Sequence, residues 1–301
     1  MEQIIYTHSE TFHVDEIFAI NLLARFWFKK PVDTLTIVRT RDKELLDSML
    51  KKQDFVIDVG RQYNPSSLNF DHHQKDLIET WADGSPLSSC GMIFHFLKEK
   101  GCFDVLSGEV VLKLESLAKK IDLCDNGVET WSDAYFFSSF NQKDGDTQKQ
   151  YIQFRKVLIT AENYIDNFIF HAERDIVARE AVDVAVKESI ENGHPEVVIF
   201  NPAMEAARFK LINTDALWIA NYYGNGDWSL KNVPSNANDV YSSKRNMPEE
   251  WCGLENEKIK EVSGFSLKFC HKQGFVASLI GSKEDVVKCV KKMLELKPLV
   301  K

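Results

Sequence analysis

The chain has 301 residues, with 37 Lys or Arg against 45 Asp or Glu, so its formal charge is −8 when the histidines are neutral. A chain this acidic is not held on nucleic acid or anionic lipid by its overall charge, so a polyanionic substrate must be met by a local basic patch or by bound cations. Contents of 44% hydrophobic and 27% charged residues exclude a disordered chain.

No run of residues approaches the roughly 18 uncharged apolar residues of a membrane span, so we expect no membrane partner. The N-terminal segment lacks the basic flank and apolar stretch of a secretion signal. The six cysteines are scattered and form no CxxC pair, which is typical of reduced thiols in an intracellular protein. We therefore expect a cytoplasmic protein, with nucleus and mitochondrion as alternatives, and the sequence leaves its oligomeric state open.

Short apolar runs alternate with amphipathic stretches in the first half of the chain. Strands are predicted at residues 4–6, 35–38 and 55–59. Helices are predicted at residues 15–27, at 42–50, from Ser88 or Ser89 to 100, and at 110–123. This β-α-β-α-β order with continuously apolar strands predicts an α/β fold, with a doubly wound, mostly parallel sheet covered by helices on both faces.

The second half of the chain begins with a long helical stretch. Residues 148–192 contain no proline and no glycine, and we place the end of the first domain at residue 147. Beyond it, strands are predicted at 197–200, 217–220 and 266–269, and a last helix at 283–294. These elements predict a second, smaller α+β domain at 193–301, with a mobile loop at 224–246.

Histidines and aspartates gather just after the predicted strands. His8 follows the first strand, and Asp58 ends the third. The other members of the pattern are His13, Asp15, Asp71, His72, His73 and Asp125. In a doubly wound sheet, ligands bind in the crevice at the carboxyl ends of the strands, so separate loops can bring these side chains to one point. A single His-x-Asp is more typical of a capped helix start, but several clusters at strand ends together favour a metal site.

Several segments together resemble a known family. They are Thr7–Glu16, Val38–Asp42, Ile57–Gly60, Asp71–Gln74, Ile121–Gly127, Trp228–Pro234, Arg245–Leu254 and Phe269–Phe275. In this order and over nearly the whole chain, they resemble the melanocyte-proliferating-gene protein family, a branch of the DHH phosphoesterase superfamily. The resemblance implies a metal-dependent 3′-to-5′ exonuclease on single-stranded RNA. It also implies a DHH-type catalytic domain at 1–147, a helical connector at 148–192 and a substrate-binding domain at 193–301.

The resemblance also implies a set of metal ligands. These are His8, His13, Asp15, Asp58, His72 and Asp125. The common superfamily pattern has an aspartate in place of His13, with one residue fewer between it and the first histidine, so the ligation by His13 stays open. Asp122 is a rival to Asp125 as the fourth-motif aspartate.

Phosphodiester hydrolysis explains why these residue types recur. It needs a hydroxide nucleophile and a sink for charge on the phosphate oxygens, which two cations about 3.5–4 Å apart supply if one carboxylate bridges them. Asp58 is the predicted bridge, and the mixed imidazole and carboxylate donors favour two Mn²⁺ ions, with Mg²⁺, Co²⁺ or Zn²⁺ as alternatives. Asp71 is expected to orient a histidine. His73 is expected to contact the scissile phosphate or serve the leaving group, unless it is a buried structural histidine.

Other residues are candidates for substrate contact. Ser89 at a helix N-terminus could hold a phosphate through backbone N–H groups, or could belong to a helix cap alone. Arg41 could meet a phosphate or pair with Asp42. Arg245, Trp251, His271 and Lys272 are assigned to gripping a nucleotide by charge and stacking.

Two further functions stay open at this point. One is hydrolysis of short oligonucleotides, small phosphoesters or pyrophosphate by the same two-metal chemistry. The other is a metal-stabilised regulatory protein that has kept the fold without turnover. The sequence does not decide between RNA and DNA, or name the RNA that is degraded.

Overall fold

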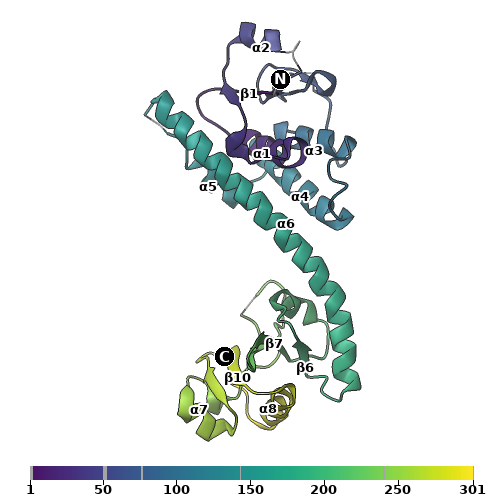
Figure 1. Cartoon of the computed structure of the whole chain (residues 1–301), viewed down its shortest axis with the longest axis vertical. Coiled ribbons are helices and arrows are strands. Elements are labelled where there is room, and N and C mark those ends of the chain that lie inside the picture. The colour runs from purple at the N-terminus through teal and green to yellow at the C-terminus, as the bar shows by residue number, and fades with distance from the viewer. Residues whose placement is uncertain (1–2, 50–52, 76, 143, 240, 301) are drawn as a thin grey trace. The chain divides into compact units, whose positions relative to one another are not determined.

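The computed structural model describes residues 3–49, 53–75, 77–142, 144–239 and 241–300. The chain forms two compact units, unit 1 at Met1–Ala172 and unit 2 at Glu173–Lys301 (Figure 1). The division falls inside the long helix α6 (Thr147–Glu191), which matches the predicted helical stretch. None of the helices among the described residues has an apolar segment long enough to cross a membrane.

Unit 1 is built on a five-stranded sheet with the strand order β2-β1-β3-β5-β4. Its strands are β1 (Ile5–Thr7), β2 (Ile37–Arg39), β3 (Phe55–Ile57), β4 (Tyr63–Asn64) and β5 (Asn69–Phe70). β1 pairs in parallel with β2 and β3, and β3 pairs in parallel with β5, while β4 is antiparallel. The three strands predicted in this region are present, and their carboxyl ends lie at the same edge of the sheet.

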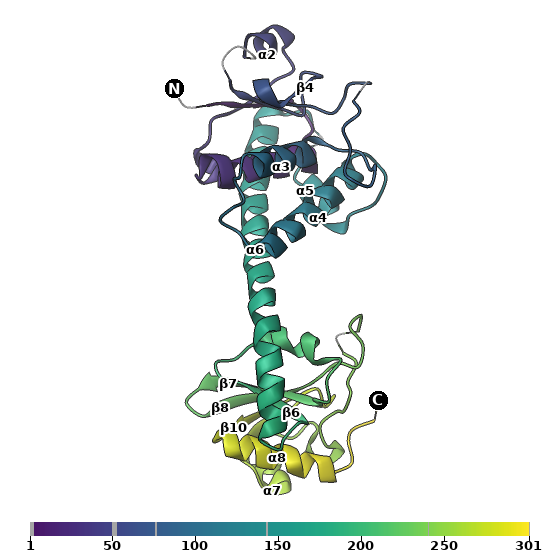
Figure 2. The same ribbon diagram turned by 90° about the vertical axis from the view of Figure 1, so that its right-hand side faces the viewer.

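Helices lie on both faces of this sheet. The helices of unit 1 before α6 are α1 (Val14–Leu22), α2 (Lys43–Met49), α3 (Ser89–Glu99), α4 (Gly108–Asp125) and α5 (Ser132–Ser138). Leu46 of α2 packs on Tyr6 and Val56, which point to one face. The opposite face carries Phe55, whose ring contacts Phe96 of α3. Figures 1 and 2 show α2 on one side of the strands and α1 with α3 on the other.

Short helical segments complete unit 1. The predicted helix at 15–27 is α1 followed by a π-helical segment, Leu23–Phe28. Two 3₁₀ turns lie at Val32–Thr34 and Pro65–Ser67. The predicted helix at 42–50 corresponds to α2, and its expected last residue, Leu50, lies outside the described residues.

Unit 2 contains a second five-stranded sheet with the strand order β6-β7-β8-β10-β9. Its elements are β6 (Val197–Phe200), β7 (Trp218–Gly224), β8 (Asp227–Asn232), α7 (Asn256–Ser263), β9 (Leu267–Cys270), β10 (Val276–Ile280) and α8 (Lys283–Glu295), with 3₁₀ turns at Glu205–Leu211 and Glu249–Trp251. β6 is parallel to β7 and the other pairs are antiparallel. The predicted α/β class is confirmed.

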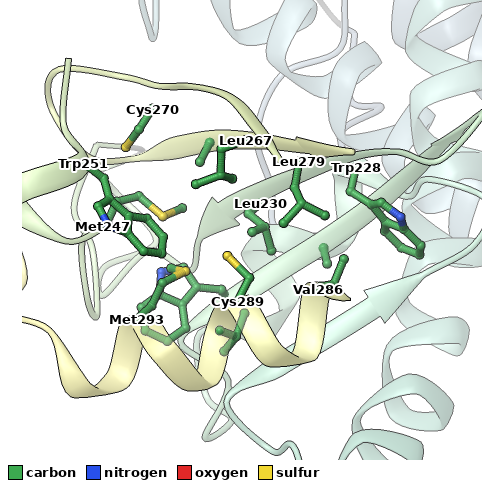
Figure 3. Packing of buried hydrophobic residues seen from close by; sticks show 14 of the residues in the cluster. Trp228, Leu230, Met247, Trp251, Leu267, Cys270, Leu279, Val286, Cys289 and Met293 are labelled. Atoms are coloured by element: carbon green, nitrogen blue, oxygen red, sulfur yellow. The ribbon is translucent and has the colours of Figure 1, made fainter. Parts of the chain in front are cut away.

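One core cluster of unit 2 lies between this sheet and α8 (Figure 3), and another packs Val182 and Ala185 of α6 on Val198 and Ile219 of the sheet. Val286, Cys289 and Met293 recur at helical spacing on one side of α8 and are buried against Leu230 and Leu279 of the sheet. Spacings of three and four residues place side chains on one helical face, so the apolar pattern of the sequence decides which face of α8 is covered.

The predicted mobile loop at 224–246 is wrong in its first part. Residues 224–232 contain a tight turn and strand β8, which pairs with both β7 and β10. Asn225 and Gly226 have φ angles of 51° and 76°. Asn-Gly in this left-handed conformation is a strong hairpin signal, because its twist matches that of the flanking strands. The polar composition of this segment is typical of a loop, although its first part forms a β-hairpin.

Candidate metal centre

The polar residues predicted to converge follow strands that end at one edge of the sheet in unit 1. His8 comes directly after β1, Asp58 directly after β3, and Asp71 directly after β5. His13 is the N-cap residue of α1, and Asp125 is the last residue of α4. The fold therefore brings side chains from five separate places in the sequence to one point, because parallel strands present their carboxyl ends together.

These side chains form three groups that could each hold a metal ion. The groups are His8, His13 and Asp58; Asp58, His72 and His73; and His13, Asp15 and Asp125. Within each group, one ligand atom per residue lies within 4.8 Å of the others. Asp58 belongs to the first two groups and His13 to the first and third, so all six predicted ligands and His73 meet in one connected cluster.

Several ligand atoms in the cluster are buried and lack hydrogen-bond partners. They are Nε2 of His8, Nε2 of His72, Oδ1 of Asp15 and both carboxylate oxygens of Asp58. Nε2 of His8 lies 3.1 Å from Asp58 and 2.9 Å from Glu16, and Nε2 of His72 lies 3.4 Å from Asp58, so these atoms lie at ion-pair distance from one another. A buried polar atom without a partner is costly, and a cation among these atoms would satisfy all of them. The donor set therefore fits a divalent metal.

The shared ligand Asp58 has an unusual backbone conformation. Its φ angle is 54°, in the left-handed region that non-glycine residues rarely adopt. Its N–H donates to the carbonyl oxygen of Phe70 at 3.0 Å, which fixes this turn against the end of β5. Strained backbone of this kind is concentrated at functional sites.

The cluster holds several carboxylates close together at buried positions, and this changes the pKa values of its members. Burial raises the pKa of Asp15 well above its usual value, and the nearby charges of Asp58 and Asp125 raise it further. Burial opposes protonation of His8, but the carboxylates of Glu16 and Asp58 outweigh it and raise its pKa to about 10. Burial also opposes ionisation of Asp58, but the imidazoles of His72 and His8 hold its pKa below the usual value. The carboxylates of the cluster therefore stabilise positive charge placed among them.

Asp71 and His73 form a pair at the edge of the cluster. Oδ1 of Asp71 accepts hydrogen bonds from Nδ1 of His73 at 2.7 Å and from its backbone N–H at 3.0 Å. Oδ2 of Asp71 accepts from the N–H of Arg61 at 2.6 Å. The side chain of His73 is 52% exposed, and the hydrogen bond to Asp71 raises its pKa despite partial burial. Asp71 therefore orients His73 and leaves its Nε2 available.

The alternatives Asp122 and Asp125 occupy different surroundings. Oδ2 of Asp125 lies 3.3 Å from Nε2 of His72, within the cluster. Asp122 is fully buried and accepts hydrogen bonds from Gly91 N–H at 2.9 Å, from the indole of Trp81 at 2.8 Å and from the Ser88 hydroxyl. Asp122 is thus occupied at the start of α3, and the geometry favours Asp125 as the ligand.

A cavity of about 500 Å³ opens beside the cluster. It is lined by His8, His13, Arg41, Lys43, Leu46, Asp58, Val59, Gly60, Arg61, Asp71 and His73. Three cationic side chains are therefore present among acidic and imidazole groups. Arg41 is exposed in the segment after β2, and its guanidinium lies 3.1 Å from Nδ1 of His8. Arg41 therefore lines the cavity and contacts a candidate ligand, and its contact with a phosphate stays a prediction.

Comparison with known proteins identifies the family of this chain. A MYG1 exonuclease family model, described as "Uncharacterised protein family (UPF0160)", matches residues 4–294. The chain belongs to the MYG1 exonuclease family. It is 29% identical to the MYG1 exonuclease of Homo sapiens, covering 90% of this chain and 81% of the human protein. It is 28% identical to the MYG1 protein of Dictyostelium discoideum, covering 90% and 91% of the two chains. The predicted family is confirmed.

Solved structures give a weaker likeness. RecJ in complex with Mn²⁺ from Thermus thermophilus is 10% identical, with a TM-score of 0.29, covering 99% of this chain and 53% of that one. An uncharacterized protein from Helicobacter pylori is 12% identical, with a TM-score of 0.28, covering 98% and 100% of the two chains.

The structure of this MYG1 family member revises the prediction for Ser89. Its side chain is fully buried, and its hydroxyl donates to the carbonyl oxygen of Phe70 at 2.9 Å. Its backbone N–H donates to Oδ2 of Asp15 at 3.2 Å. Because its backbone N–H and its hydroxyl both have partners within the protein, Ser89 is not available to a substrate phosphate. Ser89 instead links the start of α3 to β5 and to a candidate metal ligand.

Unit 2 of this MYG1 family member requires two more corrections. The Arg245 guanidinium donates to the carbonyl oxygens of Met293, Leu294 and Leu296, so it caps the C-terminus of α8 and is not free to grip a nucleotide. Trp251 is fully buried in the core and offers no stacking surface (Figure 3).

His271 and Lys272 remain accessible in unit 2. Lys272 is exposed, and His271 is half-buried in the turn after β9. Its Nδ1 accepts a hydrogen bond from the N–H of Gln273 at 3.2 Å. Contact of His271 and Lys272 with a nucleotide stays a prediction.

One residue of the site was missed from sequence. Glu16 is fully buried in the first turn of α1, with Oε1 2.9 Å from Nε2 of His8. Its position three residues after the N-cap residue is that of the acidic member of a capping box. The usual signature has serine or threonine at the first position, whereas this chain has His13, and that difference concealed the pattern.

Proposed function

We propose that this chain is a divalent-metal-dependent phosphodiester hydrolase, and more specifically a 3′-to-5′ exonuclease on single-stranded RNA. The observation that carries the proposal is the set of buried imidazole and carboxylate atoms without hydrogen-bond partners, arranged around the shared Asp58. Membership of the MYG1 exonuclease family supports the same class of reaction. The family name and the donor set arise from independent observations.

Two of the three candidate groups share Asp58, and this supports a site for two ions. His8 and His13 would share one ion with Asp58, while His72 would share the other. Asp15 and Asp125 complete the set from the side of His13 and His72. Nitrogen and oxygen donors without thiolate suit Mn²⁺, with Mg²⁺, Co²⁺ and Zn²⁺ as alternatives. When bound, a pair of such ions supplies an activated water and neutralises charge on the phosphate oxygens.

The remaining residues of the cavity have roles that follow from their positions. Arg41, Lys43 and Arg61 bring positive charge to the cavity, where they attract the phosphates of an anionic chain. His73, oriented by Asp71 and half exposed, is placed to give a proton to the leaving oxygen. The cavity of about 500 Å³ lies within the size range of small-ligand sites, so one nucleotide would fit there.

The proposal is tested by offering several substrates to the full chain with Mn²⁺. A 5′-labelled RNA 20-mer, the matched DNA, a dinucleotide and pyrophosphate separate the candidate activities. We expect stepwise shortening of the RNA from its 3′ end, with release of mononucleotides. Cleavage of the dinucleotide alone would replace the exonuclease with a short-oligonucleotide hydrolase, and turnover of pyrophosphate alone would remove nucleic acid as the substrate.

Two variants link the activity to the cluster. Asp58→Asn removes the shared negative charge and should lower turnover by more than about 100-fold, since even indirect partners of metal ligands contribute about 10- to 100-fold. Asp33→Asn makes the same chemical change at an exposed position of unit 1 and should leave turnover unchanged. Metal binding without turnover on any of these substrates would favour a metal-stabilised regulatory protein.

A further inference from the structure

One buried carboxylate beside the candidate ligands belongs to none of the three metal groups found among the described residues. Glu16 lies in the first turn of α1, and its side chain is inaccessible to solvent. A buried carboxylate is costly unless it is paired or hydrogen-bonded. The contacts of Glu16 therefore show which partners stabilise its buried carboxylate.

The two oxygens of Glu16 join a strand end to a helix start. Oε2 accepts a hydrogen bond from the Thr7 hydroxyl, at the last residue of β1. Oε1 accepts from the backbone N–H of His13 at 3.2 Å and lies 2.9 Å from Nε2 of His8. One carboxylate thus contacts the residues on both sides of the loop that separates two candidate ligands.

A second side chain holds the same loop from outside. Arg39, at the end of β2, donates to the carbonyl oxygen of Glu10 at 2.9 Å. Its guanidinium lies 4.4 Å from the ring centroid of Phe154 and 3.9 Å from Oε1 of Glu16. The side chain of Arg39 is only 7% exposed, so its charge acts on Glu16 with little screening by water. The loop between His8 and His13 is therefore fixed from both sides.

We infer that Glu16 is a positioning residue for the proposed metal pair. Through the Thr7 hydroxyl and the backbone N–H of His13 it fixes the loop that carries His8 and His13, and its carboxylate lies next to the ion that these histidines would hold. Outer partners of metal ligands tune metal affinity. The inference rests on the metal site of the proposed function.

The test is a Mn²⁺ titration of the full chain, followed by the electron paramagnetic resonance signal of free Mn²⁺. Glu16→Gln keeps the shape of the side chain and removes its charge. We expect about 10- to 100-fold weaker binding of one of the two ions. Glu10→Gln makes the same change at an exposed position of the same loop and should bind Mn²⁺ as the wild type does.

Two readouts separate positioning from a purely structural role. The spin-coupled signal of a Mn²⁺ pair should be lost in Glu16→Gln at Mn²⁺ concentrations that saturate the wild type, and should return at higher concentrations. Turnover should recover with it, while KM for RNA stays unchanged. If Glu16→Gln does not fold, Thr7→Val removes the donor to Oε2, with Thr7→Ser as the control that keeps the hydroxyl.

The outcomes distinguish this inference from the proposed function. Wild-type affinity for both ions in Glu16→Gln, or in Thr7→Val if that variant is used, overturns the positioning role, while RNA cleavage by the wild type leaves the exonuclease standing. Weaker Mn²⁺ binding in the variant, together with a wild type that cleaves no phosphodiester, supports the positioning role and overturns the exonuclease.

Discussion

Unit 1 contains two buried aspartate sites that differ in how their oxygens are satisfied. Asp58 is 3% exposed and neither of its carboxylate oxygens has a hydrogen-bond partner among the described residues. Asp122 is fully buried and receives hydrogen bonds from Ser88, Gly91 and Trp81. Proteins satisfy nearly all buried polar atoms, so an unsatisfied carboxylate indicates a missing partner, whereas a satisfied one indicates structure. Burial alone does not separate the two roles.

The largest expected effect is on stability, at the satisfied site. Asp122→Ala leaves three donors at the start of α3 without an acceptor, each worth about 1–3 kcal/mol when buried. We expect a loss of about 3–5 kcal/mol in the free energy of unfolding, measured by urea denaturation of the metal-free protein. Asp33→Ala, at an exposed position, is the control and should change stability by less than about 0.5 kcal/mol.

At Asp58, by contrast, we expect the main effect on stabilisation by bound metal. Mn²⁺ at about 100 times its Kd should stabilise the wild type by about 2.7 kcal/mol, and removal by a chelator should reverse the effect. Asp58→Asn should show no such stabilisation when it is compared with its own metal-free state, which loses the attraction between Asp58 and the imidazoles of His8 and His72. Equal stabilisation of Asp58→Asn and wild type by Mn²⁺ would contradict the distinction between the two aspartates.

The pH dependence of unfolding sharpens the comparison. Burial raises the pKa of Asp122 to about 7, although the hydrogen bonds from Ser88 and Gly91 oppose this shift. The folded state thus keeps a proton that the unfolded chain loses near pH 3.8. This contribution to stability is complete below pH 3.8 and is lost as the pH rises through 7, with a slope of at most about 1.4 kcal/mol per pH unit.

The measurement is the difference in unfolding free energy between wild type and Asp122→Asn from pH 5 to pH 8. The variant does not titrate at this position, so the difference should move against the wild type as the pH rises. A difference that is constant with pH would show that Asp122 is ionised throughout.

The smallest expected effect concerns Arg245 in unit 2. Arg245→Met removes the donors to three carbonyl oxygens at the end of α8 while keeping a long side chain. We expect a loss of about 1 kcal/mol in the free energy of unfolding, because these carbonyls lie at a helix end near water. KM for RNA should not change, and a several-fold rise in KM would restore the predicted substrate contact.

The convergence of the candidate ligands could be predicted from sequence, and their division into roles could not. His8, Asp58 and His72 follow strands, and parallel strands end at one edge of a sheet. The pattern of residue types was therefore enough to predict that they lie at that edge. Asp122 and Asp125 are three residues apart on one helix and face similar directions. Only the contacts of α4 with α3 and His72 separate them.

The remaining errors arose where tertiary contacts override local chemistry. Ser89 and Arg245 have groups that can bind phosphate, but in the fold the N–H of Ser89 donates to Asp15 and the guanidinium of Arg245 donates to backbone carbonyl oxygens. Trp251 is an aromatic residue in a family-like motif, and its burial depends on the packing of unit 2. A single sequence contains the chemistry of such residues but not the partners that occupy them.

The left-handed backbone of Asp58 has a consequence for how this protein can change. Such a conformation costs of order 1–3 kcal/mol in a residue other than glycine, and it is kept because it aims one side chain. Glycine at this position would relieve that cost. A laboratory search that selects only for heat resistance is therefore drawn toward losing the ligand, and any such campaign needs a simultaneous screen for function.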